Sequence, residues 1–196
     1  MIKGRRVNLR RLRLSDLPCL LKWWADGELM RYYDRLPVNS PVEVEEEIRR
    51  NIGSPNRLDF MVETKRGEPV GLMYLQKIDW RNRHCELHIM VGEQARRNGL
   101  FGVEAAFLLS RYSFHQLNMH KIYGRVFEYA STVQTLTEHL GFRREAVLRN
   151  SVYQGGRYWD LYIYGLLKRE FEAYLKTSKG RRGQRYLAAS QPGSRD

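Results

Sequence analysis

The chain has 196 residues, of which 42% are hydrophobic and 29% charged, as in a globular domain with a sizeable core. It contains no apolar run near the roughly 20 residues of a membrane span, and its first residues lack the apolar segment of a signal peptide. Cys19 and Cys85 have no metal-ligand or redox spacing. We therefore expect a cytoplasmic protein with no membrane association and no metal site.

The net charge of +12 is concentrated at the two ends of the chain, because residues 1–13 carry +6 and residues 176–196 carry +5. Nucleic acid is one partner of such ends, and polyanionic cofactors such as coenzyme A are another. A solvated first strand and a disordered tail are the simpler interpretation. We predict a single domain over residues 1–175 and a basic, disordered tail over residues 176–196.

Hydrophobic periodicity, capping residues and turn residues predict the elements in chain order. They are a strand, two helices, three strands, a helix, a strand, a helix and two strands, with a short terminal helix. Ser40 and Glu43 form a capping box at the start of the second helix. The expected ranges are 7–14, 16–24, 40–52, 58–63, 69–78, 84–91, 103–114, 121–127, 132–140, 142–152, 158–167 and 168–175.

The most informative stretch runs from His84 to Phe114. It begins with the strict alternation of a half-buried strand, continues as a basic loop with glycines, and ends in an apolar helix. The N-terminus of a helix presents unpaired N–H groups and a partial positive charge, so it is suited to bind an anion. We interpret this loop as the site of a phosphate-bearing cofactor.

Several segments, in this order, resemble the GNAT acyltransferase superfamily and within it the RimJ/RimL-like branch. The resemblance covers residues 5–172 and implies an α+β fold. Such a fold has a mixed, mainly antiparallel sheet with a V-shaped split between its central strands, flanked by helices. The segments that carry it are GEPVGLMYLQKIDWRNRHCEL, VGEQARRNGLFGVEA, FHQLNMHKIYGRVFEYAS and LGFRREAVLRNSVYQGGRYWDLYIYGLL.

The resemblance implies acetyl-CoA as acyl donor, direct attack of an amine on the thioester, and no metal. The pyrophosphate is expected on the glycine loop, and the pantetheine arm and thioester along the splayed central strand. The implied donor-binding residues are Ile89, Met90, Val91, Arg96, Arg97, Asn98, Gly99, Leu100, Phe101, Gly102 and Ala130.

The chain departs from the family pattern at three positions. An alignment without gaps puts Leu100 where the loop pattern has its first glycine, and the other register puts Phe101 at its last position. Ala130 stands where an asparagine that contacts pantetheine is common. Thr137 stands where the family usually has a tyrosine, the general acid to the departing thiolate.

An aliphatic hydroxyl is a poorer proton donor than a phenol, so three interpretations of Thr137 remain open. It contributes only a hydrogen bond, with water or a tyrosine such as Tyr129 or Tyr153 as donor; the thiolate leaves unassisted; or acyl transfer has been lost.

An amine must be neutral to attack, so a base should take its proton. Glu86 and His88 share one face of the central strand and can both point into the cleft. We predict Glu86 as the base, through water, and His88 as the second candidate; the alternative is that Glu86 pairs with an arginine. On the acceptor side we expect Tyr32, Tyr33 and Asp34, together with Glu86.

The leading hypothesis is an acetyl-CoA-dependent N-acetyltransferase that acts on a primary amine of a small molecule, such as a nucleotide-linked amino sugar. The alternatives are an enzyme that acetylates protein N-termini, as ribosomal members of the branch do, and a non-catalytic protein that binds CoA or nucleic acid. A homodimer would agree with the resemblance, because dimers are frequent among such proteins. The sequence does not favour nucleic acid or the ribosome as partner.

Overall fold

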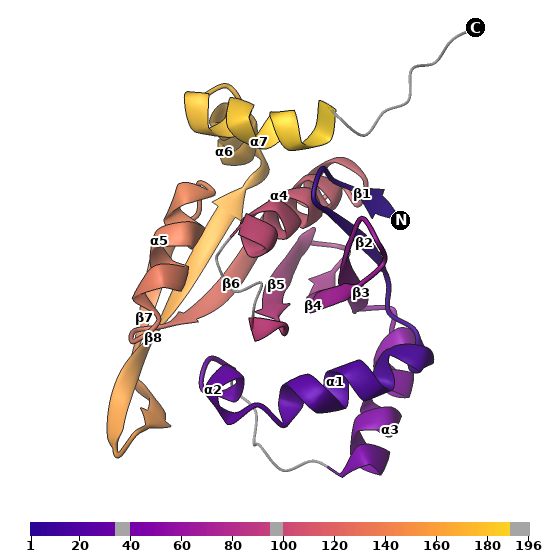
Figure 1. Cartoon of the computed structure of the whole chain (residues 1–196). Helices are drawn as coiled ribbons and strands as arrows, with labels where there is room; N and C mark the ends of the chain where they lie inside the picture. Colours follow the sequence, from indigo (N-terminus) through magenta and orange to yellow (C-terminus); the bar gives the residue numbers. More distant parts are fainter. Residues whose placement is uncertain (34–39, 95–99, 189–196) are drawn as a thin grey trace, which may run out of the picture.

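A computed structural model of the chain describes residues 1–33, 40–94 and 100–188. Within these residues, eight strands form one sheet in the order β1-β2-β3-β4-β5-β6-β8-β7, and every pair is antiparallel except β5–β6. The mixed, mainly antiparallel sheet that the sequence predicts is therefore confirmed (Figure 1). The strands are β1 Ile2–Lys3, β2 Val7–Arg11, β3 Leu58–Thr64, β4 Pro69–Asp79, β5 His84–Val91, β6 Lys121–Phe127, β7 Arg143–Gln154 and β8 Arg157–Leu167.

Helices cover both faces of this sheet (Figure 1). The N-terminal helices lie below the open end of the sheet in that view, whereas α4 crosses it and α6 and α7 lie above. The helices are the 3₁₀ turn η1 Leu14–Asp16, α1 Leu17–Trp24, α2 Gly27–Met30, α3 Pro41–Ile52, α4 Leu100–His115, α5 Ser131–His139, α6 Lys168–Leu175 and α7 Ser178–Ala188.

Successive side chains of β5 point to opposite faces of the sheet, so they pack against different helices. Cys85 and Leu87 belong to the large core under α4, whereas Met90 belongs to a second core under α1, α2 and α3. Glu86 and His88 alternate with Cys85 and Leu87, so they face the second layer. The predicted pairing of Glu86 and His88 on one face of the central strand is confirmed by this arrangement.

The predicted capping box at the start of α3 is also confirmed. The Ser40 hydroxyl accepts a hydrogen bond from the Glu43 N–H at 3.2 Å, and the Glu43 carboxylate accepts one from the Ser40 N–H at 2.8 Å. The proline at the first helical position needs no N–H partner there. The α3 helix can therefore begin abruptly and place its buried face, with Val44 and Ile48, on the second core.

The C-terminal region differs from the disordered tail that its composition predicts. Residues Ser178–Ala188 form α7, which packs against α6 and α4. Two glycines allow the close approach: a Cβ at Gly183 would lie 2.8 Å from the ring of Phe107, and one at Gly180 would overlap the carbonyl of Tyr174. Composition reports only how much apolar surface a segment itself can bury, so it does not reveal a segment that is ordered by packing on neighbouring helices.

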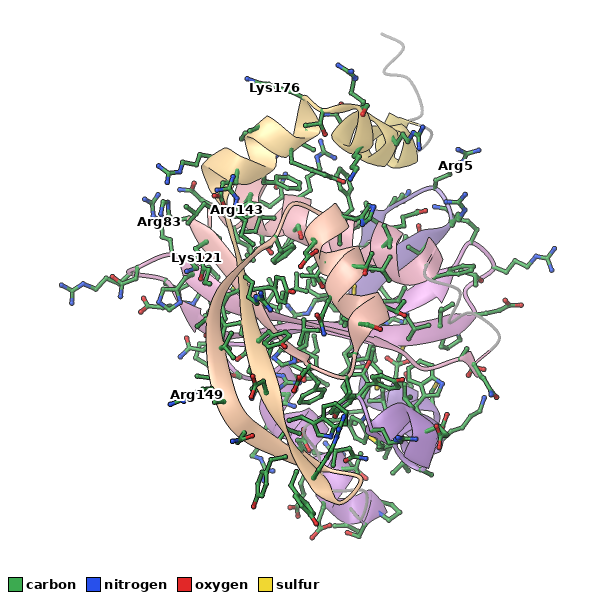
Figure 2. The ribbon with its side chains drawn as sticks, turned by 90° about the vertical axis from the view of Figure 1, so that its left-hand side faces the viewer. Arg5, Arg83, Lys121, Arg143, Arg149 and Lys176 are labelled. Carbon is green, nitrogen blue, oxygen red and sulfur yellow. The ribbon has the colours of Figure 1, made fainter. Side chains whose placement is uncertain are left out.

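The charged side chains project outward around the whole molecule (Figure 2). Arg83, Lys121 and Arg143 lie together on one side of that view, and Arg5 lies on the other. Lys121 and Arg143 are paired with Glu145 and Glu170, so the basic groups of this side are offset by acids, and the net positive charge stays concentrated at the chain ends. No helix among the described residues is long and apolar enough to cross a membrane.

Candidate active site

The central strands β5 and β6 part soon after they meet. They are parallel and in register only from His84 to Glu86 on β5 and from Lys121 to Tyr123 on β6. Beyond these pairs the two strands have no register partner in each other, although β5 continues to Val91 and β6 to Phe127. The edge of β5 from Leu87 onward is therefore not paired with β6. We refer to this opening as the split.

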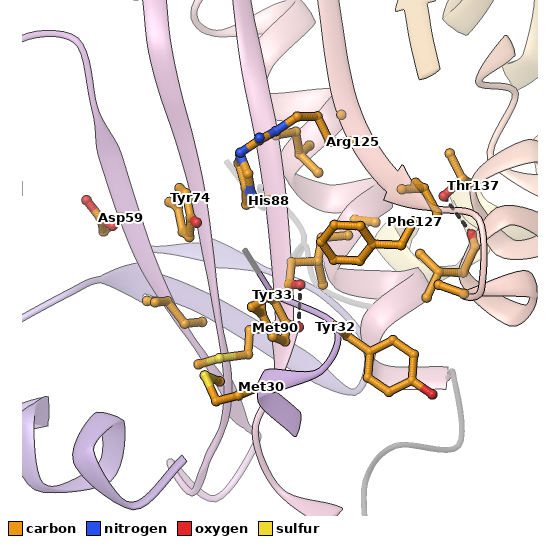
Figure 3. A pocket seen from close by; sticks show the side chains of 18 of the residues that line it. Met30, Tyr32, Tyr33, Asp59, Tyr74, His88, Met90, Arg125, Phe127 and Thr137 are labelled. Carbon is orange, nitrogen blue, oxygen red and sulfur yellow. Dashed lines mark hydrogen bonds between the residues drawn. The ribbon is translucent and has the colours of Figure 1, made fainter. Parts of the chain in front are cut away.

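A cavity of about 270 Å³ passes through the split. Figure 3 shows it between the sheet, the segment after α2 and helix α5. Its lining combines residues of both layers, so a molecule on the α5 side can reach one on the α1–α3 side. The residues that line it include Met30, Tyr32, Tyr33, Glu47, Arg57, Asp59, Tyr74, His88, Ile89, Met90, Arg125, Phe127, Ala130, Val133 and Thr137.

The segment after α2 covers the split from the acceptor side. The Tyr33 hydroxyl donates a hydrogen bond to the Ile89 carbonyl at 2.8 Å, and the Tyr129 hydroxyl donates one to the Arg31 carbonyl at 2.6 Å. The rings of Tyr32 and Tyr129 are 6.2 Å apart. The structure thus brings the predicted acceptor residues Tyr32 and Tyr33 to the cavity. Asp34 lies outside the described residues.

Glu86 is fully buried and lies at the centre of an ionic cluster. Its Oε1 lies 2.7 Å from Arg125 Nε and 2.9 Å from His88 Nε2, and its Oε2 lies 2.8 Å from Lys77 Nζ. Gln76 Nε2 donates to the same Oε2 at 3.3 Å. Glu86 is therefore paired with an arginine, Arg125, as the alternative interpretation of the sequence expected.

Burial raises the pKa of the Glu86 carboxyl, but its partners outweigh that effect. Hydrogen bonds from His88 and Lys77, with the charges of His88 and Arg125, hold the pKa well below its usual range. Such a carboxylate stays ionised and is a weak proton acceptor. It suits the stabilisation of cations better than the removal of a proton from an amine.

His88 is held by stacking as well as by hydrogen bonds. Its ring lies on that of Tyr74 with centroids 4.5 Å apart and planes 9° apart; Figure 3 labels both residues. The Arg57 guanidinium covers the Tyr74 ring at 4.0 Å. The β4–β5 register explains the stack, because Tyr74 lies directly opposite His88. His88 therefore has a fixed ring that lines the cavity.

The donor side of the cavity is lined by the end of β5, by Ala106 of α4 and by residues of helix α5. Ile89 and Met90 line the cavity, whereas Val91 packs against the large core. Leu100 is the first residue of α4, with Phe101 and Gly102 in its first turn, so the loop does lead into a helix N-terminus. Arg96, Arg97, Asn98 and Gly99 lie outside the described residues.

The entrance to that loop is fixed by α1. The side chain of Trp23 packs directly on Gly92, where any Cβ would overlap its indole ring, and Trp23 Nε1 donates to Glu93 Oε1 at 2.9 Å. Lys22 Nζ lies 2.8 Å from the same oxygen. Helix α1 thereby holds the chain where it leaves β5 for the loop.

Helix α5 places the other two predicted residues at the cavity. Ala130 is its buried N-cap residue, and Thr137 lies two turns further along. The Thr137 hydroxyl donates to the Val133 carbonyl at 2.7 Å, the usual local bond of a threonine within a helix. Tyr153, one alternative proton donor, is 64% exposed near the end of the β7–β8 hairpin and is not in contact with this cavity.

Several cavity residues carry charge or aromatic surface and were not predicted. Arg57 and Asp59 on the β3 side form a close ion pair at 2.8 Å, and Tyr74 and Arg125 come from β4 and β6. The alternation of β4 could have predicted Tyr74, because it places this side chain on the same face of the sheet as His88 of the neighbouring strand. Arg125 could be found only with the parallel β5–β6 register, which the sequence alone does not supply.

A cavity that passes through a split between two central parallel strands is the arrangement that the resemblance to acyltransferases predicts. Residues 6–143 match the family model of the acetyltransferase (GNAT) domain, and the chain belongs to this family. It is therefore an N-acetyltransferase, and acetyl-CoA is its acetyl donor.

Similar proteins cover nearly the whole domain. An uncharacterized N-acetyltransferase, p20 of Bacillus licheniformis, is 29% identical over 171 residues, which are 85% of this chain and 95% of that protein. The spermidine N(1)-acetyltransferase of Vibrio cholerae is 30% identical over 158 residues, 79% of this chain and 89% of that enzyme. The crystal structure of the spermidine N-acetyltransferase of V. cholerae in complex with CoA and spermine has a TM-score of 0.81 at 27% identity. It matches 85% of this chain and 98% of that one.

These findings confirm the predicted superfamily, fold and donor. Within the described residues, no group of three or more His, Cys, Asp or Glu side chains is placed to hold a metal ion. The RimJ/RimL-like branch and the roles of individual site residues remain predictions.

Proposed function

We propose that the acceptor is the primary amine of a small molecule, and that aliphatic polyamines are the favoured class. The observation that carries this proposal is the cavity: about 270 Å³, covered by the α1–α3 layer and lined by aromatic rings and carboxylates. A cation is attracted to the face of an aromatic ring and to a carboxylate. The similarity to two spermidine N-acetyltransferases supports the same class.

The guanidinium groups in the cavity do not argue against a cationic acceptor. Arg57 is paired with Asp59 at 2.8 Å, and Arg125 with Glu86 at 2.7 Å. The Arg57–Asp59 pair is close to neutral as a unit, whereas the Glu86 carboxylate is shared by Arg125 and Lys77. The rings of Tyr32 and Tyr33, which line the cavity, supply the local preference for positive charge.

On the donor side, we assign pyrophosphate binding to residues 96–102 and pantetheine contacts to Ile89, Met90, Val91 and Ala130. The helix N-terminus at Leu100 supports the first assignment, because its N–H groups and dipole favour an anion. The edge of β5 that is not paired with β6 and the cavity lining at Ile89 and Ala130 support the second.

On the acceptor side, we assign proton removal from the amine to His88 and a positioning role to Glu86. His88 Nε2 lies 2.9 Å from Glu86 Oε1 and 2.9 Å from Gln76 Nε2. In the tautomer that carries its proton on Nε2, this nitrogen donates to the ionised Glu86 in a charge-assisted hydrogen bond, and Nδ1 is the proton acceptor. Glu86 would then stabilise the imidazolium that forms, as a carboxylate does behind a catalytic histidine. The low pKa of Glu86 and the place of His88 in the cavity support this order of roles.

Direct attack on the thioester needs no nucleophile from the protein, and neither cysteine suits that role. Burial raises the pKa of the Cys85 thiol to about 12, and burial with the charge of Glu93 raises that of Cys19 to about 11. Cys85 also faces the α4 core, away from the acceptor layer. A thiol that stays protonated is a poor nucleophile.

An acceptor panel tests the proposal. The chain of 196 residues is incubated with acetyl-CoA and one acceptor at a time, and thiol release is followed. The acceptors are spermidine, spermine, a nucleotide-linked amino sugar and peptides with ribosomal-protein N-termini. We expect turnover with the polyamines. Turnover with the amino sugar alone, or with the peptides alone, would replace the polyamine class with that acceptor.

The non-catalytic alternative predicts a different pattern: binding of CoA without thiol release, or salt-sensitive retention on nucleic acid with no response to acetyl-CoA. A thermal shift with acetyl-CoA and CoA but not with ATP, together with thiol release, would contradict it.

A further inference from the structure

Tyr33 places a phenol inside the split. It lies three residues beyond α2, and its hydroxyl donates to the carbonyl of Ile89 at 2.8 Å, the contact drawn as a dashed line in Figure 3. The bond joins residues 56 positions apart in the sequence. It therefore reflects tertiary placement of this hydroxyl and not a local turn.

The Ile89 carbonyl marks the place where the two substrates meet. The cavity is continuous from the acceptor residues Met30 and Tyr74 to the α5 residues Ala130 and Thr137, and it passes the sheet only where β5 has no β6 partner. A thioester that enters from the α5 side and an amine that enters from the α1–α3 side must react there. The Tyr33 hydroxyl is therefore hydrogen-bonded to β5 at the place where we expect the thioester and the amine to react.

The other hydroxyl groups near the cavity are less suited to give a proton to the leaving sulfur. The Thr137 hydroxyl is aliphatic and bonded to the Val133 carbonyl. Tyr74 is stacked on His88 and covered by Arg57, so its hydroxyl belongs to the acceptor layer. The Tyr129 hydroxyl is bonded to the Arg31 carbonyl at the edge of the split.

Tyr32, the remaining tyrosine among the described lining residues, is half-exposed, and its ring is turned toward Tyr129. Its environment is therefore close to bulk water. Among the described tyrosines that line the cavity, Tyr33 is the one whose hydroxyl contacts the backbone of β5 beyond its pairing with β6.

We infer that Tyr33 is the general acid of the acetyl transfer and takes the place of the tyrosine that Thr137 replaces. The neutral amine attacks the thioester carbonyl, a C–N bond forms, and the C–S bond breaks with its electron pair on sulfur. The Tyr33 hydroxyl gives its proton to that sulfur, so that free CoA leaves as a thiol. The ammonium proton passes to His88 or to water, and the phenolate regains a proton from the same source.

The bond to Ile89 is then the resting position of the acid. An amide N–H of the pantetheine arm can take over that carbonyl, which has no ladder partner in β6. The Tyr33 hydroxyl is then freed from Ile89 only when acetyl-CoA is bound, so the proton donor becomes available when the leaving sulfur is in the site.

The test compares Tyr33→Phe with the wild type and with Tyr158→Phe, a control that removes a hydroxyl from a ring 62% exposed on the β7–β8 hairpin. For Tyr33→Phe we expect kcat with acetyl-CoA to fall by roughly 10²–10⁴-fold, the usual contribution of general acid catalysis. The KM for acetyl-CoA and the thermal shift with CoA should stay near wild type. Tyr158→Phe should match the wild type throughout.

A second donor separates acid catalysis from positioning. The acetyl thioester of thionitrobenzoate releases an aryl thiolate, which leaves without a proton, so Tyr33→Phe should slow this donor far less than acetyl-CoA. A wild-type kcat in Tyr33→Phe, or an equal loss with both donors, would overturn the inference. The inference about Tyr33 rests on acetyl transfer and not on the class of acceptor. Spermidine is used first, and any other amine of the panel that the wild type acetylates serves equally.

Discussion

At the scale of single residues, the pair Glu86 and His88 shows where sequence reasoning is sufficient and where it is not. The two-residue spacing places both side chains in the acceptor layer, as predicted. The partners of Glu86 come from β4 and β6, and these partners decide its electrostatics. Long-range neighbours leave no local signal in the sequence, so the division of roles needs the fold.

Substitution of the two residues should separate those roles. We expect His88→Gln to lower kcat by roughly 10²-fold or more, the contribution of a general base, while the KM for acetyl-CoA changes little. Glu86→Gln should lower kcat less, because the imidazole remains but its tautomer and charge are no longer supported. A larger loss in Glu86→Gln than in His88→Gln would return the base to Glu86.

The depressed pKa of Glu86 also predicts a dependence of stability on pH. Because the folded pKa lies below the unfolded one, the carboxylate stabilises the fold above its unfolded pKa, and this contribution is lost as the pH falls toward the folded pKa. Glu86→Gln should therefore lower the free energy of unfolding by about 1–3 kcal/mol near neutral pH, since it leaves buried donors without their charged partner.

Denaturant titrations measure this difference, which should shrink when they are repeated at about pH 3. Glu145→Gln is the matched control, because Glu145 pairs with Lys121 at 2.6 Å on the surface and such pairs contribute about 0–1 kcal/mol. A Glu86 effect as small as that of Glu145, or one that does not diminish in acid, would contradict the proposed electrostatics.

At the scale of elements, seven of the eight described strands and most helices were predicted from periodicity, and α6 begins and ends where the pattern predicts. The two-residue strand β1 was not predicted, because it is too short to show alternation. The four-residue helix α2 was not predicted, since so short a helix has no periodicity to detect. Its start is local, with Asp26 accepting from the Leu29 N–H at 3.1 Å, but its position over the split depends on the tyrosine contacts.

The contact between α1 and the end of β5 gives a prediction about the loop. Gly92→Ala would drive a Cβ into the indole of Trp23 and should destabilise the fold by about 1–3 kcal/mol, as overpacking of a filled site does. The displaced Trp23 would also lose its bond to Glu93, so the chain that enters the donor loop would shift.

We expect a smaller thermal shift with CoA in Gly92→Ala than in the wild type. Gly53→Ala is the control, because a Cβ there meets no atom closer than the Arg49 carbonyl at 3.9 Å. An unchanged CoA response in Gly92→Ala would mean that α1 does not hold the loop.

At the scale of the whole molecule, the sequence predicted the layered sheet, its order of elements and the split, because a long run of matched segments in order constrains topology. It did not predict that a single cavity joins the two sides of the sheet, since that depends on how Tyr33, Phe127 and Thr137 approach across three elements. It also missed α7, whose docking depends on glycine contacts with Phe107 and Tyr174 and not on its own composition.

The central claim is that donor and acceptor occupy this one cavity together and react directly. Initial rates of thiol release, measured with acetyl-CoA and spermidine varied against each other, test it most directly. We expect double-reciprocal lines that intersect, because both substrates must be bound before the C–S bond breaks. Parallel lines would show an acetyl-enzyme intermediate and would contradict direct transfer through the split.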